Sequence, residues 1–163
     1  MKITCRAVIF LLLTILVTAF IWHNSLQDAV DSREASKFFD LLLVQLVKLS
    51  GGVLSWQDVD HFVRKLAHFT EFALLGMMLR SFFAAAMTWG RQLLSRCTLL
   101  ALCLCAMVAG MDEYLQQFSP GRSCQLSDVA LDSSGALMGI LAVELLVYLL
   151  WRFGAWENFR KVC

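Results

Sequence analysis

Long apolar runs alternate with short polar segments along this chain. Apolar residues dominate four stretches, at about residues 3–22, 61–89, 93–118 and 126–151. Since about 20 apolar residues form a helix that crosses a bilayer, each stretch is long enough to span one. The first stretch lacks the small-residue cleavage site of a signal peptide, so we expect it to be retained. The pattern predicts an all-α, polytopic membrane bundle of four transmembrane helices, in a single domain over residues 1–163.

A shorter amphipathic run lies between the first two stretches. After a polar segment at residues 25–36, apolar residues from Lys37 to Leu49 are interrupted by Asp40, and Gly51 follows the run. At roughly 14 residues this run is too short to cross a bilayer, and glycine typically ends a helix. An interfacial or re-entrant helix therefore fits better than a span, and we predict one interfacial helix in the first outward loop.

Composition agrees with a membrane protein and excludes several classes. The chain is 59% hydrophobic and 17% charged, whereas a soluble domain is nearer half apolar and a quarter charged. The net charge is +1, and no basic run is interleaved with aromatic residues, so no nucleic-acid partner is predicted. The six cysteines form no C-x-x-C pair, so they predict neither a disulfide framework nor a metal site.

The basic residues indicate an orientation. In the four-span topology they gather on one side, at the N-terminus, the second connection and the C-terminal tail: Lys2, Arg6, Arg91, Arg96, Arg152, Arg160 and Lys161. Lys and Arg in short loops mark the cytoplasmic side of a membrane. We therefore predict that both termini are cytoplasmic, and that the acidic first and third connections face outward.

Polar residues from four separate segments are expected at one depth on the outward side. They are Ser25 and Gln27 after the first helix; Arg64, Lys65, His68 and Glu71 in the second; Asp112, Glu113 and Gln116 at the end of the third; and Arg122, Asp128 and Asp132 around the start of the fourth. Ionisable residues in membrane helices usually mark a functional site. The alternative is structural, because such charges also neutralise one another between helices.

Helical spacing places these residues on defined faces. In the second span, an i, i+4, i+7 series shares one face: Arg64, His68 and Glu71. In the fourth span, the same spacing extends through two glycines: Asp128, Asp132, Gly135 and Gly139. Small residues allow close helix packing in membranes, so the charged face of the fourth span is predicted to lie against a neighbouring helix.

Four motifs together resemble the VanZ-like family of bacterial membrane proteins. They are HNSLQ (His23–Gln27), RKLAHFTEF (Arg64–Phe72), DEYLQQFSPGR (Asp112–Arg122) and DVALDSSGALMG (Asp128–Gly139). Two positions depart from the family pattern: Phe72 stands where the family often has Tyr, and Asp132 where Asn is also common. The resemblance implies the same fold, a bacterial cytoplasmic (inner) membrane location and these functional positions. It also implies a role in the cell envelope, since the family is named for a protein linked to teicoplanin resistance.

The first functional hypothesis is an outward-facing site that acts on or binds a lipid-linked or phosphorylated head group. Its candidate catalytic residues are His68, Glu71, Asp112, Glu113 and Asp128. Its candidate substrate-binding residues are Ser25, Gln27, Arg64, Lys65, Gln116, Arg122 and Asp132. Arginine binds anions by bidentate contacts, and histidine is the best general acid/base by its ordinary pKa. The acidic residues suit a general base or an oxygen ligand for a divalent cation. No closely spaced motif such as H-E-x-x-H is present, so no metal ligands are assigned, and the cofactor is unknown.

The second hypothesis is a non-enzymatic envelope protein. It alters antibiotic access by binding a lipid precursor, the drug or another membrane protein, and the run from Lys37 to Leu49 is its docking surface. Membrane lipid is the expected partner under either hypothesis.

Two charged residues inside the spans have a structural interpretation. Arg80, toward the inner end of the second span, either extends to the cytoplasmic interface or pairs with Glu144 of the fourth.

The predicted orientation is tested by cysteine labelling in intact cells. Cys124 lies in the third connection and Cys163 in the tail. We expect an impermeant maleimide to label Cys124 and not Cys163, because the tail carries the basic residues of the cytoplasmic side. Labelling of Cys163 alone from outside would contradict this orientation.

Overall fold

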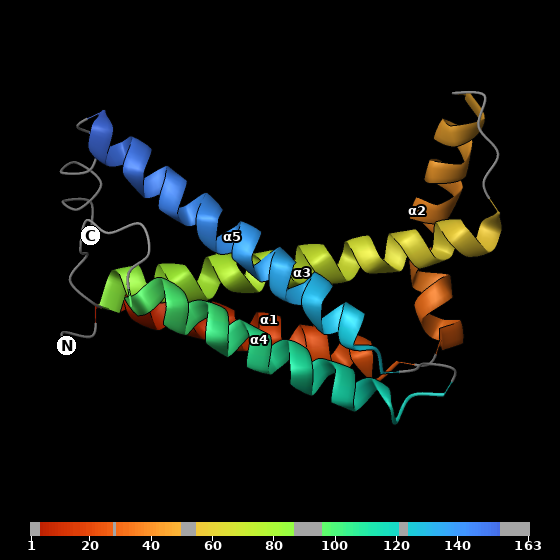
Figure 1. Ribbon diagram of the computed structural model, residues 1–163, viewed down its shortest axis with the longest axis horizontal. Helices are drawn as coiled ribbons and strands as arrows, with labels where there is room; N and C mark the ends of the chain where they lie inside the picture. The colour runs from red at the N-terminus through yellow and green to blue at the C-terminus, as the bar shows by residue number, and fades with distance from the viewer. Residues whose placement is uncertain (1–3, 28, 50–54, 87–95, 121–123, 154–163) are drawn as a thin grey trace.

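The protein is built from helices. A computed structural model describes residues 4–27, 29–49, 55–86, 96–120 and 124–153. Within these residues it has five helices and no strand: α1 (Cys5–Ser25), α2 (Ala29–Leu49), α3 (Trp56–Ala86), α4 (Arg96–Gln116) and α5 (Leu126–Arg152). The predicted all-α class is confirmed (Figure 1).

Four of these helices are long and apolar enough to cross a membrane. They are α1, α3, α4 and α5, in agreement with the four predicted spans. Their outward surfaces carry large apolar side chains, such as Ile15 and Leu16 on α1 and Leu145 and Leu146 on α5. Because water penalises such surfaces and lipid does not, the exposure fits a bundle surrounded by hydrocarbon.

The helix α2 is longer than the sequence pattern suggested. We expected a polar segment at residues 25–36 and a helix only from Lys37, but α2 begins at Ala29. No glycine or proline interrupts residues 29–49, and Glu34 and Lys37 form an i, i+3 ion pair at 3.4 Å. Helix propensity therefore extends the element beyond its apolar part. Its location at the membrane interface stays a prediction.

The helix α3 organises the bundle. Its 31 residues extend roughly 46 Å, which exceeds the roughly 30 Å thickness of a bilayer core. Figure 1 shows α5 crossing α3, α1 and α4 running together on its other side, and α2 crossing its N-terminal end. Where α2 meets α3, Val44 and Val59 are buried. The N-terminal end of α3 therefore extends past the other spanning helices.

Small residues allow α4 to pack closely into the core. Ala101, Cys105 and Ala109 recur every four residues on one face of α4, and all three are fully buried. They belong to one hydrophobic cluster with Phe72 and Leu75 of α3. Dispersion contacts with small residues replace the hydrophobic effect as the packing force in lipid.

Glycines bring the backbones of α3 and α5 into contact. A Cβ atom at Gly135 would overlap the carbonyl oxygen of Phe69, and one at Gly139 would overlap that of Ala73. In the same way, a Cβ atom at Gly76 on α3 would overlap the carbonyl oxygen of Ala136 on α5. The predicted close approach of the glycine face of α5 is confirmed, and its neighbour is α3.

This contact predicts a sharp difference between two glycines. Gly139→Ala should destabilise the protein by about 1–3 kcal/mol, because the new methyl group meets backbone that cannot yield without moving a helix. Gly110→Ala, in α4, is the matched control: nothing lies within 4 Å of its added Cβ, and alanine favours a helix by up to about 1 kcal/mol. Thermal unfolding in detergent measures both. Equal melting temperatures for the two variants would contradict the contact.

Candidate functional site

A polar cavity of about 180 Å³ lies where α3 and α5 begin and α4 ends. Seven of the predicted site residues line it: Arg64, Lys65, His68, Glu113, Gln116, Asp128 and Asp132. The helix α3 supplies the first three, α4 the next two and α5 the last two. The structure thus brings residues from three spans together, as their common predicted depth implied.

Basic residues of α3 form the wall of the cavity. The Arg64 guanidinium contacts Asp60, one turn earlier, at 2.9 Å. The Lys65 ammonium donates to Asp128 Oδ1 of α5 at 3.0 Å. All four side chains are partly exposed, so these ion pairs are reachable from solvent. Ion pairs in such positions contribute only about 0–1 kcal/mol, and they exchange partners readily.

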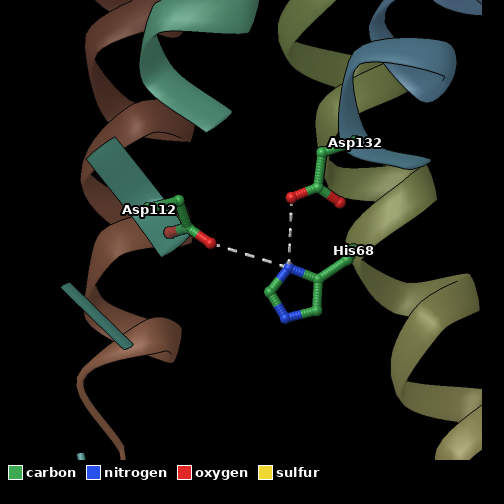
Figure 2. A group of neighbouring side chains, drawn as sticks. All are labelled: His68, Asp112 and Asp132. Carbon is green, nitrogen blue, oxygen red and sulfur yellow. Dashed lines mark ion pairs between the residues drawn. The ribbon is translucent and has the colours of Figure 1, made fainter. Parts of the chain in front are cut away.

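Three side chains meet at the floor of the cavity: His68 and Asp132 line it, and Asp112 lies next to His68. Figure 2 shows the three side chains. The Nδ1 atom of His68 lies 3.8 Å from Asp112 Oδ2 and 4.0 Å from Asp132 Oδ2. The three come from α3, α4 and α5, and both carboxylates are buried. Their ligand atoms lie within 4.8 Å of one another, so among the described residues these three form a donor set that could hold a metal ion.

Hydrogen bonds fix Asp112 in place. Its Oδ1 accepts a hydrogen bond from Ser25 Oγ at 2.6 Å, and its Oδ2 accepts one from Gln116 Nε2 at 3.0 Å. Ser119 Oγ in turn donates to the carbonyl oxygen of Ser25 at 2.8 Å. The predicted residues Ser25 and Gln116 therefore orient a carboxylate, and they join the end of α1 to the end of α4.

Asp132 lacks comparable support. Its side chain is 1% exposed, and neither oxygen has a hydrogen-bond partner among the residues that the structure describes. A buried carboxylate without hydrogen bonds costs several kcal/mol of folding free energy. Such a group does not contribute to stability by itself, so its presence at the floor of a polar cavity points to function.

Two further acidic residues are held by neighbouring segments. Glu113 Oε2 accepts a hydrogen bond from the backbone N–H of Gln125 at 2.9 Å, just before α5 begins. Glu71 Oε1 accepts one from Asn24 Nδ2 of α1 at 2.8 Å, and Glu71 is not among the residues lining the cavity. Glu113 thus anchors the start of α5, while Glu71 ties α3 to α1.

Four of the predicted site residues that the structure describes do not line the cavity: Ser25, Gln27, Glu71 and Asp112. Gln27 is partly exposed after the end of α1 and does not line the cavity. Arg122 lies outside the described residues.

Sequence reasoning missed several participants that hold the site in place. They are Asn24, Asp60, Ser119 and Gln125. Asp60 had a detectable signal, because it stands four residues before Arg64 on a helix. The partners of the other three are set by packing between helices, which the sequence does not specify.

A second charged cluster lies deeper in the bundle. Glu144 Oε1 accepts hydrogen bonds from Arg80 Nε at 2.8 Å and from Thr98 Oγ1 at 2.6 Å. Arg80 is 2% exposed and Glu144 4%. The expected pairing with Glu144 is confirmed, whereas the alternative that Arg80 extends to the interface is wrong. This cluster joins α3, α4 and α5 through satisfied hydrogen bonds.

These features define an integral membrane protein with four spanning helices and a partly buried polar site at one end of the bundle. The chain belongs to the VanZ/LLP1 family, whose model matches residues 10–151. The match includes α2, α3, α4, most of α1 and α5, and every candidate site residue. No curated protein and no solved structure matched the chain.

The deeper cluster should behave as a structural ion pair. We expect Glu144→Gln to destabilise the protein by about 3–5 kcal/mol, because it removes the carboxylate that compensates the buried Arg80 guanidinium. The double variant Arg80→Met/Glu144→Leu should recover most of that loss, since both charges are then gone. Thermal unfolding of the two variants gives the comparison. A double variant less stable than Glu144→Gln would contradict the assignment.

Proposed function

We propose that this protein binds the phosphorylated head group of a membrane lipid in the cavity between α3, α4 and α5. The observation that carries the proposal is the pair of basic side chains, Arg64 and Lys65, on the wall of a cavity in a membrane bundle. A phosphate group is the anionic chemistry that arginine and lysine recognise best at a membrane surface.

The ion pairs of the wall support this assignment. Arg64 and Lys65 each contact one partly exposed carboxylate, on Asp60 and Asp128. Such pairs are weak, so an arriving phosphate displaces a carboxylate at little cost. Arginine then offers two parallel N–H donors, and lysine offers a compact positive charge.

Apolar residues beside the wall suit the rest of a lipid. Phe62 and Leu66, one helical turn apart on α3, are both exposed. They flank Arg64 and Lys65 in the sequence, so α3 presents polar and apolar surfaces next to each other. Acyl chains that pack on the apolar surface place their phosphate near the basic one.

The family relationship narrows the kind of lipid that we propose. The basic residues of the chain favour cytoplasmic termini, and on this basis we propose that the cavity faces the outer side of a bacterial inner membrane. A link of the VanZ-like family to teicoplanin resistance fits a site that handles a lipid-linked cell-envelope precursor on that side. We therefore propose such a precursor as the natural ligand.

The second candidate function is a non-enzymatic scaffold that alters antibiotic access by docking a partner on α2. Its support is a group of exposed apolar side chains on that helix: Phe38, Phe39, Leu41 and Leu42. The same surface suits contact with lipid at the interface. Head-group binding is favoured because the cavity collects residues from three helices, whereas the α2 surface comes from one.

Lipid titration of the purified protein tests the proposal. A short-chain phosphatidic acid should bind, and the diacylglycerol with the same chains should bind far more weakly, because only the former offers a phosphate. Lys65→Gln should weaken phosphatidic acid binding about tenfold or more, and Lys65→Arg should restore most of it.

The matched control for this experiment is Lys37→Gln, which removes an exposed lysine on α2. It should bind phosphatidic acid like the unchanged protein. Equal affinity for both lipids, or unchanged affinity in Lys65→Gln, would sink the head-group proposal.

A further inference from the structure

The floor of the cavity has the composition of a metal site. His68 Nδ1, a carboxylate oxygen of Asp112 and one of Asp132 lie within 4.8 Å of one another. Figure 2 shows the imidazole and the two carboxylates directed toward a common point from three different helices. These residues are far apart in the sequence, so they form no local motif with metal-ligand spacing from which the site could be predicted.

Asp132 supplies an independent reason for a cation. Its carboxylate is 1% exposed, and neither oxygen receives a hydrogen bond in the described part of the chain. The contact recorded for it is His68 Nδ1 at 4.0 Å, which is too long for a hydrogen bond. Buried charges in proteins are normally paired or coordinate metals, and among the described residues no cation lies at bonding distance from this one.

We propose that His68, Asp112 and Asp132 bind one divalent transition-metal ion, and that this ion helps to hold the phosphate of the head group. The second clause rests on the proposed function; the first stands without it. One imidazole nitrogen and two carboxylate oxygens suit Zn²⁺ or Mn²⁺ better than Mg²⁺ or Ca²⁺, which are usually bound by oxygen ligands alone.

The distances are close to those that coordination requires. Ligand atoms about 2.0–2.2 Å from a tetrahedral zinc ion lie roughly 3.3 Å from one another. The observed distances from His68 Nδ1 are 3.8 and 4.0 Å, so small side-chain rotations bring the three atoms to bonding range.

The surroundings of Asp112 resemble the outer shell of a metal centre. Ser25 and Gln116 donate hydrogen bonds to its two oxygens and fix the direction of the carboxylate. Groups behind a ligand commonly orient it and raise metal affinity. Ser25 lies on α1, so all four spanning helices contribute to this proposed centre.

The ion also resolves an electrostatic difficulty of the head-group site. A phosphate that enters the cavity approaches Asp132 in its lining and Asp112 beside His68, and like charges repel. A divalent cation bound between these carboxylates offsets their charge. With three protein ligands it keeps an open position for a phosphate oxygen, while Arg64 and Lys65 contact the same group from the wall.

Metal titration of the full-length protein, purified in detergent and stripped with a chelator, tests the site directly. Calorimetry should show one equivalent of Zn²⁺ or Mn²⁺ per chain, with Mg²⁺ at least tenfold weaker. His68→Gln and Asp132→Asn should each reduce Zn²⁺ affinity tenfold or more. His23→Gln, which removes an exposed histidine of α1, should leave it unchanged.

Folding of each variant is checked by gel filtration and thermal unfolding. Asp132→Asn keeps the shape of the side chain and removes a buried charge, so it should fold. The visible absorption of bound Co²⁺ reports the same site, and the two substitutions should abolish it. Stoichiometric Zn²⁺ binding that survives both substitutions in folded protein would overturn the site, as would the absence of binding.

Lipid titration with and without Zn²⁺ separates this inference from the proposed function. Phosphatidic acid affinity should rise at least tenfold when the stripped protein is reloaded. Metal binding without any preference for phosphatidic acid over diacylglycerol would refute the proposed function and leave the metal site standing. Head-group preference that is unaffected by Zn²⁺ would refute the link between the ion and the lipid.

Discussion

The direct contact between the backbones of α3 and α5 is the constraint on which the rest of the structure depends. Without Cβ atoms at Gly135 and Gly139, the two helices lie close enough for α5 to meet carbonyl groups of α3. In lipid, where apolar surfaces gain little from leaving their solvent, such packing is a main source of association. The close approach of α3 and α5 also sets Asp128 against Lys65 and Asp132 beside His68. The same helix contact therefore holds the fold together and positions the site.

The two charged clusters inside the bundle illustrate how stability and function differ. Around Glu144, each recorded contact is short, and donors from two other helices satisfy one carboxylate oxygen. Asp132 is equally buried but has no hydrogen bond in the described residues. Selection for stability alone would favour an apolar residue in place of Asp132. A carboxylate beside His68 is understandable if a bound ligand balances its charge, because functional sites commonly tolerate destabilising groups.

Much of this arrangement was predictable because it follows from helical periodicity and membrane thickness. Apolar length gave the four spans, and the i, i+4 spacing of Asp132 and Asp128 gave the face that meets α3. The sequence did not show where α2 begins, since helix propensity continues past its apolar part. Nor did it show which donor serves Asp112. A helix turns about 100° per residue, so the choice of Ser25 depends on how α1 is rotated in the bundle.

The length of α3 explains why the site lies at the end of the bundle rather than in its centre. The helix is longer than a bilayer core is thick, and its N-terminal turns extend past the other spanning helices. Charged residues near this end of α3, such as Lys65 with its partner Asp128, are partly exposed, and exposed charges are solvated at little cost. One turn deeper, His68 meets two buried carboxylates among the ends of α4 and α5. Along this one long helix, partly exposed basic side chains are therefore followed by contacts with buried carboxylates. Under the proposed function, this arrangement would let a charged head group approach the floor of the cavity without entering hydrocarbon.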